Sequence, residues 1–65
     1  MNKQNELLLD LIRDDFDRVR WAQPHSVTRA EELIKMVVMA NFIDEAKEMI
    51  LDAKEYGYDY TNLLK

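Results

Sequence analysis

The sequence predicts an all-α domain: a small three-helix bundle in which the first helix packs on a C-terminal helical hairpin, followed by a short helical turn. Apolar residues recur every three or four positions through three segments, which is the period of an amphipathic helix. Only one glycine and one proline interrupt the 65 residues. No run alternates apolar and polar residues as a half-buried strand would. These observations indicate a single helical domain.

The first helix is predicted over residues 4–22. Its charged residues lie on one side, and Pro24 ends it because the residue before a proline is pushed out of the α region. The apolar stripe that should face the core consists of Leu8, Leu11, Ile12, Phe16 and Val19, widened by Leu9 and Ala22.

The second helix is predicted over residues 28–40. Thr28 and Glu31 have the spacing of a capping box, in which each side chain satisfies the other's exposed backbone amide. Ser26 is an alternative cap. The broad apolar face of this helix consists of Ala30, Leu33, Ile34, Val37, Val38 and Ala40.

The third helix is predicted over residues 43–56, after a tight turn at Asn41 and Phe42. Gly57 suits the position after this helix, where a left-handed backbone conformation is common. A last helical turn is predicted over residues 60–64. Two helices joined by so short a turn form an αα-hairpin. The apolar face of the third helix consists of Ile43, Ala46, Met49, Ile50, Ala53 and Tyr56.

The composition is that of a soluble acidic protein. The net charge of −4 disfavours general attraction to nucleic acid or to an anionic membrane. There is no cysteine, which leaves no disulfide or thiolate metal site. The apolar runs are far shorter than the roughly 20 residues that span a bilayer, and no signal-peptide pattern opens the sequence. We therefore expect a cytoplasmic protein that does not bind membranes.

Groups that carry chemistry are few, and we expect no enzymatic activity. The one histidine, His25, is followed by Ser26 in a loop, and neighbours in a loop do not form a catalytic dyad. A single glycine cannot build a glycine-rich phosphate loop. Asp10 and Asp14 share a helix face, but two carboxylates without loop carbonyls hold a cation weakly. We predict no catalytic residue, no cofactor and no metal site.

Several apolar side chains lie outside the stripes. Leu51 falls on the opposite face of the third helix, and Met39 lies away from the stripe of the second helix. Leu7 in the first helix adds to this surplus of apolar side chains. A domain this small buries only about 60% of its unfolded surface, and methionine is common on adaptable binding surfaces. We predict that Leu7, Met39 and Leu51 are apolar contacts for a partner.

Residues 18–29 form a basic corner that contains no acid. Arginine and tryptophan together are favoured in binding hot spots, and arginine grips phosphate or carboxylate. An alternative is that the tryptophan folds over the core as a lid, while the arginines complement a helix C-terminus. The candidate anchor consists of Arg18, Arg20, Trp21 and Arg29.

The third helix presents an acidic face around Leu51. Carboxylates around a central apolar side chain resemble a small interface with a polar rim, which could occupy a basic groove on a partner. The alternative is a plain solvated face. Tyr56 and Tyr60 should close the open end of the bundle. The candidate contacts are Glu48, Asp52 and Glu55, with Tyr58 from the tail.

Part of the hairpin resembles known helical families. Residues 53–57, with the turn after them, resemble small antirepressor peptides, which implies a hairpin that binds the dimerisation helices of a repressor. A similarity to the second half of a pentatricopeptide-type repeat is carried by Asp44, Glu45, Ala46, Met49, Lys54 and Gly57.

These observations predict a small acidic, non-enzymatic interaction module: a regulator or inhibitor that binds a partner protein, forms a homodimer, or does both. By analogy of size and class, a phage- or plasmid-borne accessory protein fits this description. The alternative is a helix-turn-helix DNA-binding domain that uses the basic corner at residues 18–29. The usual geometry of such a domain places the second hairpin helix in the major groove, where the carboxylates of the third helix would repel phosphates. The geometry that uses the basic corner offers only three arginines. Binding to nucleic acid is therefore disfavoured.

Overall fold

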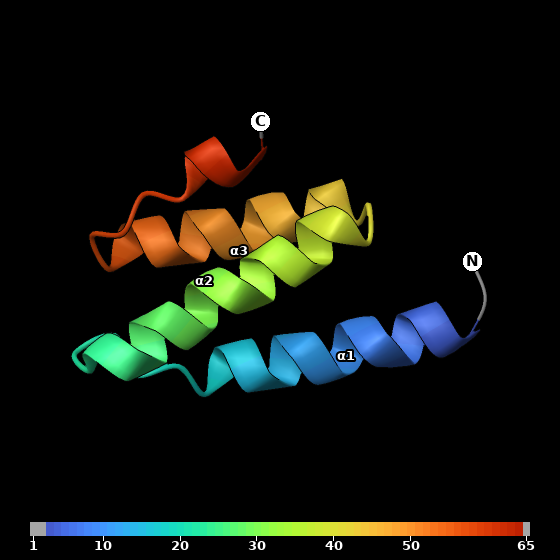
Figure 1. Ribbon diagram of the computed structural model, residues 1–65, viewed down its shortest axis with the longest axis horizontal. Coiled ribbons are helices and arrows are strands. Elements are labelled where there is room, and N and C mark those ends of the chain that lie inside the picture. The colour runs from blue at the N-terminus through green and yellow to red at the C-terminus, as the bar shows by residue number, and fades with distance from the viewer. Residues whose placement is uncertain (1–2, 65) are drawn as a thin grey trace.

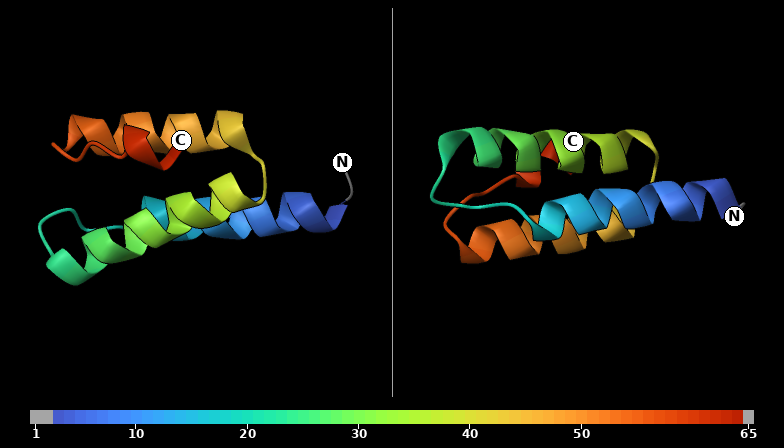
Figure 2. Two further views of the ribbon diagram at one scale, coloured as in Figure 1. Left: turned by 45° about the horizontal axis from the view of Figure 1, so that its top comes forward. Right: turned by 90° about the horizontal axis from the view of Figure 1, so that it is seen from below.

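Three α-helices and one short 3₁₀ helix make up the part of the chain that the computed structural model describes, residues 3–64, with side chains from residue 6 onward. α2 forms one layer of the bundle, and α1 and α3 form the other (Figures 1 and 2). The short 3₁₀ helix η1 packs on α2 and α3. The predicted all-α three-helix bundle with a C-terminal helical turn is confirmed. The elements are α1 (Lys3–Asp17), α2 (Pro24–Met39), α3 (Ile43–Glu55) and η1 (Thr61–Leu64).

The first helix is shorter than predicted and the second is longer. α1 ends at Asp17 rather than at residue 22, and α2 begins at Pro24 rather than at residue 28. Pro24 opens a helix instead of ending one, because the first helical position needs no backbone N–H donor. Ser26 fixes the connection, since its Oγ accepts a hydrogen bond from the backbone N–H of Arg20 at 2.7 Å.

Thr28 lies within α2 rather than at its N-terminus. Its hydroxyl donates to the carbonyl oxygen of Pro24, one turn earlier, at 3.1 Å. The N-cap position is Gln23, which makes no side-chain capping bond. Glu31 pairs with Lys35 at 3.5 Å. The predicted capping box is therefore wrong, because the helix starts a full turn earlier than the sequence pattern indicated.

Asn41 makes the tight turn of the predicted αα-hairpin. Its φ is 68°, a left-handed conformation that asparagine tolerates. The backbone N–H of Asn41 donates to the carbonyl oxygen of Val38 at 2.9 Å, and that of Phe42 donates to the carbonyl oxygen of Val37 at 3.1 Å. This Schellman pattern satisfies the last carbonyls of α2. α3 then begins at Ile43, as predicted.

Gly57 ends α3 in the same way, as predicted. Its φ is 93°. The backbone N–H of Gly57 donates to the carbonyl oxygen of Lys54 at 3.0 Å, and that of Tyr58 donates to the carbonyl oxygen of Ala53 at 3.1 Å. This second Schellman motif turns the chain back, so that η1 returns along the hairpin.

The core lies where the inner faces of the three helices meet. All of its members are apolar or aromatic, and none of the described buried residues is charged. Tyr60, from the segment before η1, closes one side of it. The buried side chains are Leu9, Ile12, Phe16, Ala30, Leu33, Ile34, Val37, Ala46, Met49, Ile50, Ala53 and Tyr60.

Five residues that the periodicity placed on the core-facing stripes are exposed instead: Leu8, Leu11, Ala22, Ala40 and Tyr56. Ala22 and Ala40 lie beyond the ends of α1 and α2. Leu8 and Leu11 are exposed, and Leu9 occupies the core instead. Apolar residues cover most of the circumference of α1 between residues 7 and 12, so the pattern does not distinguish its inner side from its outer side. Tyr56 is 60% exposed because it follows the end of α3 and stacks on the outside of the bundle.

Candidate interaction surface

Four exposed apolar side chains lie together on α1 and the adjoining edge of α2. We call Leu7, Leu8, Leu11 and Met36 the α1 apolar surface. Leu7 is 62% exposed and Leu11 is 69% exposed. Leu8, Leu11 and Met36 border a hollow of about 340 Å³ between the two helices. Of these four residues, only Leu7 was among the partner contacts predicted from the sequence.

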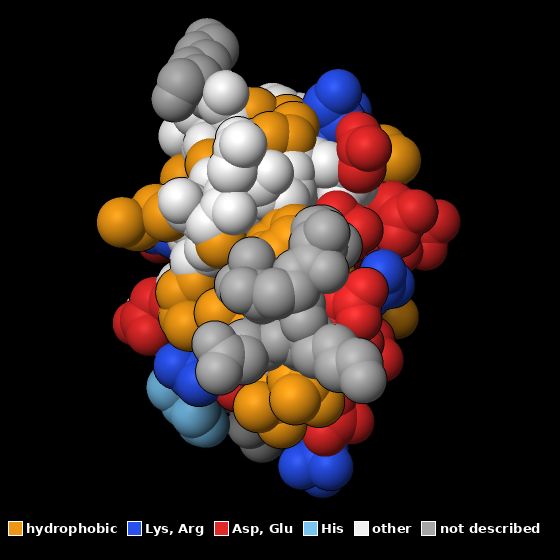
Figure 3. All heavy atoms as spheres, turned by 90° about the vertical axis from the view of Figure 1, so that its right-hand side faces the viewer, with side chains coloured by type: hydrophobic (Ala, Val, Ile, Leu, Met, Phe, Trp, Pro, Cys, Tyr) orange, Lys and Arg blue, Asp and Glu red, His pale blue; other side chains and the backbone are white. Residues whose placement is uncertain are grey.

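Residues 7–12 give the first half of α1 apolar side chains on both of its sides. At about 100° per residue, Leu7 falls opposite to Phe16, which lies in the core, and Leu11 falls within about 40° of Leu7. Figure 3, which looks at the end of the molecule where α1 begins, shows apolar side chains at the surface and carboxylates gathered along one edge. The run of residues 7–12, interrupted only by Asp10, was the sequence signal for this second apolar side.

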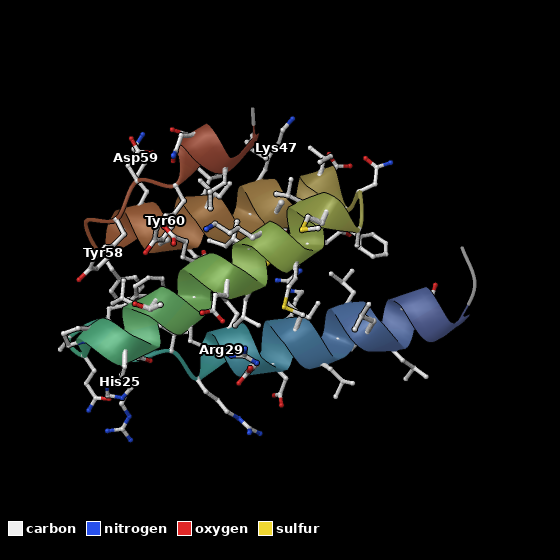
Figure 4. All side chains as sticks on the ribbon, in the orientation of Figure 1. His25, Arg29, Lys47, Tyr58, Asp59 and Tyr60 are labelled. Carbon is white, nitrogen blue, oxygen red and sulfur yellow. The ribbon has the colours of Figure 1, made fainter. Side chains whose placement is uncertain are left out.

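The arginines of the basic corner contact acids of their own chain. Arg29 donates through Nε and Nη2 to Asp15 Oδ2 at 3.1 and 2.8 Å, which links α2 to α1 (Figure 4). Arg18 Nη2 lies 3.1 Å from Asp14 Oδ2. Arg20 is exposed and forms no ion pair within residues 6–64. These contacts neutralise most of the corner, and the four predicted anchor residues do not converge on one site.

Trp21 lies against the end of the core among other aromatic side chains. Its ring stacks on Tyr56 with centroids 5.2 Å apart and on Tyr58 with centroids 5.5 Å apart. It meets Phe16 edge-on at 5.8 Å. The hydroxyl of Tyr58 donates to the carbonyl oxygen of Trp21 at 3.2 Å. Trp21 therefore takes the position of the lid, one of the two alternatives that the sequence left open, and Tyr58 packs beneath it.

The three predicted acidic contacts of α3, Glu48, Asp52 and Glu55, lie toward α1. Glu48 Oε2 is 3.2 Å from Arg13 Nη1. Asp52 and Glu55 line a hollow of about 260 Å³ together with Asp17 of α1, and we call this the acidic hollow. None of these three carboxylates forms an ion pair in the described part of the chain. Negative charge therefore gathers at the border between α1 and α3.

Leu51 and Met39 are exposed, but they lie on other elements than the α1 apolar surface. Met39 is 87% exposed at the end of α2, and Leu51 is 63% exposed on α3. Leu51 borders a hollow of about 250 Å³ with Lys47 and with Leu64 of η1. In Figure 4 Lys47 projects from α3 beside η1. The three apolar contacts predicted from the sequence thus come from three different helices.

The segment after α3 holds two groups with a shifted pKa. The backbone N–H and the hydroxyl of Thr61 both donate to Asp59 Oδ1, at 3.0 and 2.7 Å. These bonds lower the pKa of Asp59. Burial raises the pKa of Tyr60, and the neighbouring negative charge of Glu31 adds to this effect. Both shifts arise from the way η1 is capped and packed.

Neither a group of three potential metal-ligating side chains nor a helix able to cross a membrane occurs in the part of the chain that the structure describes. His25 points outward at the start of α2 (Figure 4). The absence of catalytic residues, cofactors and metals stays a prediction. Comparisons with protein families, with curated proteins and with solved structures found no match. The likeness of residues 44–57 to known helical hairpins therefore stays a local resemblance.

Proposed function

We propose that this protein is a non-enzymatic interaction module that regulates or inhibits a protein partner, or pairs with a second copy, by burying the α1 apolar surface. The supporting observation is that Leu7 and Leu11 are exposed on one side of a helix whose other side forms the core. Covering one leucine fully is worth about 1.5–3 kcal/mol, so this surface can drive association. By analogy of size and charge, we assign the protein to the cytoplasmic accessory regulators that phages and plasmids encode.

Replacement of Leu11 tests this proposal. Leu11→Glu places a charge within the α1 apolar surface, and the bundle should remain folded because the side chain is mostly exposed. Leu51→Glu is the matched control, since Leu51 has similar exposure on a different helix. Sedimentation velocity reports self-association, and capture from a lysate of the native host with identification of the bound protein reports partner binding. We expect Leu11→Glu to abolish the association that the native chain shows and Leu51→Glu to retain it.

Two results would contradict the proposal. If Leu51→Glu abolished association while Leu11→Glu did not, the interface would lie at the hollow between α3 and η1 instead. A native chain that sediments as a monomer and captures no protein would remove the interaction function altogether.

The DNA-binding alternative has less support. Arg18 and Arg29 already contact carboxylates of their own chain, and affinity for DNA comes largely from cations that displace counterions. The basic corner therefore offers few free cations to phosphate groups.

A further inference from the structure

We propose that the α1 apolar surface docks an amphipathic helix of a basic protein partner, in preference to a second copy of this chain. The inference rests on the proposed function and names the class of partner. It follows from the shape of the α1 apolar surface and from the charges that flank it.

The α1 apolar surface has a form that a partner helix fits. Leu7 and Leu11 stand one helical turn apart as an exposed ridge, and Leu8 and Met36 border the hollow of about 340 Å³ beside it. Helices pack by laying the ridges of one into the grooves of the other. Helix-in-groove recognition uses apolar anchors at this one-turn spacing. The occupant is therefore a helix with a single apolar stripe.

The two flanks of the leucine ridge differ in charge. On the flank toward α2, Asp14 and Asp15 are each paired with an arginine of the same chain. On the flank toward α3, Asp10 and Asp17 share a face of α1 and form no ion pair within the described residues. Arg13 lies between them on this face, and its ion pair is with Glu48 of α3. Asp17 also borders the acidic hollow. Uncompensated negative charge therefore lies along one side of the ridge.

A second copy of the chain would meet like charges at this place. Asp10 lies between Leu7 and Leu11 in the sequence and forms no ion pair within the described residues, so two leucine ridges in contact also bring the Asp10 carboxylates of both copies together. Like charges across an interface oppose binding, and the net charge of −4 repels copies at longer range. A helix with lysine or arginine on one flank instead places cations against Asp10 and Asp17, which speeds encounter and fixes orientation.

Two synthetic helical peptides of the same length as α1 test the inference. One has a leucine stripe with lysine elsewhere, and the other has glutamine in place of every lysine. Titration calorimetry with the full chain should show the lysine peptide binding at least about tenfold more tightly at low salt, a difference that narrows as salt screens the charges. Leu11→Glu should abolish binding of both peptides. Asp10→Asn combined with Asp17→Asn should lower the affinity for the lysine peptide to that for the glutamine peptide, whereas Asp44→Asn combined with Glu45→Gln, an equal change of charge at the start of α3, should not.

The outcomes separate this inference from the proposed function. Equal affinity for the two peptides, with both abolished by Leu11→Glu, would overturn the basic partner and leave the docking surface in place. A native chain that binds neither peptide and sediments as a dimer would make the second copy the occupant. A monomer that binds neither peptide would overturn this inference. The proposed function is tested separately, because it is contradicted only if the native chain sediments as a monomer and captures no protein from a lysate of the native host.

Discussion

The hydroxyl of Tyr58 donates a hydrogen bond to the backbone carbonyl of Trp21 at 3.2 Å, while the rings of the two residues stack with centroids 5.5 Å apart. The contact ties the connection between α1 and α2 to the segment that follows α3. Trp21 lies beyond the end of α1 at Asp17. At this end of the bundle, aromatic contacts therefore hold the chain in place where helix packing does not. Phe16, the last core residue of α1, meets the other side of the cluster.

Tyr58→Phe should lower the free energy of unfolding by about 0.5–1.5 kcal/mol, the usual contribution of one hydrogen bond, because the ring can still stack on Trp21. Trp21 is the one tryptophan of the chain, so its fluorescence during urea unfolding measures the free energy of unfolding of each variant. Tyr56→Phe is the control, since its hydroxyl makes no hydrogen bond to the described residues and should leave stability unchanged. Equal losses in both variants would show that the Tyr58 hydroxyl has no special role.

Gly57→Ala should destabilise the protein by about 1 kcal/mol, because an L-residue is strained at a φ of 93°. A Cβ added at this position would have nothing within 4 Å, so backbone strain alone sets the loss. Asn41→Gly makes the reverse change at the other Schellman motif, where glycine suits the left-handed conformation. This variant should leave the free energy of unfolding unchanged or raise it slightly. The midpoints of urea unfolding of both variants give the comparison. An unchanged midpoint for Gly57→Ala would mean that the turn relaxes out of the left-handed conformation.

The hairpin could be predicted from the sequence because local chemistry determines it. Gly57 ends α3 in the left-handed conformation that glycine favours, a preference that does not depend on the rest of the fold. The tight turn at Asn41 and Phe42 lies where it was predicted, although the left-handed conformation of Asn41 was not predicted. The end of α1 could not be predicted in this way. The apolar period continues to Val19, which predicts a longer helix. The helix nevertheless ends at Asp17, because the residues after it make contacts with residues distant in the sequence, such as the hydrogen bond between Trp21 and Tyr58.

The candidate site was less predictable than the fold. Which of the leucines in residues 7–9 enters the core depends on how α1 is rotated against the hairpin, and the sequence pattern fits more than one rotation. The pairing of Arg29 with Asp15 likewise depends on the approach of α2 to α1. The sequence alone does not show these ion pairs, so the arginines of the basic corner look available to a partner although two of them already contact carboxylates of the same chain.

Asp59 should contribute stability that disappears in acid. Its pKa in the folded chain is lowered by the two donors of Thr61, so this contribution is present above the unfolded pKa, near 3.8, and is lost as the pH falls through the folded value. Between neutral and strongly acid pH, the free energy of unfolding should therefore decrease less in Asp59→Asn than in the native chain. Thr61→Val should raise the pKa of Asp59 toward its ordinary value in an NMR titration. An acid dependence identical to that of the native chain in Asp59→Asn would refute the linkage.

Duplex DNA should not bind the native chain, because Arg18 and Arg29 are held by Asp14 and Asp15. Fluorescence anisotropy with labelled duplex at low salt measures this. Arg29 also lies 3.7 Å from Glu32, so Asp14→Asn combined with Asp15→Asn and Glu32→Gln should release both arginines and introduce weak binding that falls with added salt. Tight, salt-sensitive binding by the native chain would instead revive the helix-turn-helix alternative.

Leu9→Ala and Leu11→Ala should separate the two apolar sides of α1. Leu9 lies in the core, so its truncation should lower the free energy of unfolding by about 2–5 kcal/mol. Leu11 is mostly exposed, and its truncation should change the stability of the isolated chain by no more than about 0.5 kcal/mol. Urea unfolding at several protein concentrations makes the comparison, because a Leu11→Ala effect that grows with concentration would mean that a second copy covers this side. If both variants lost the same free energy of unfolding at every protein concentration, both leucines would belong to the core. α1 would then have no exposed apolar side for a partner to bind.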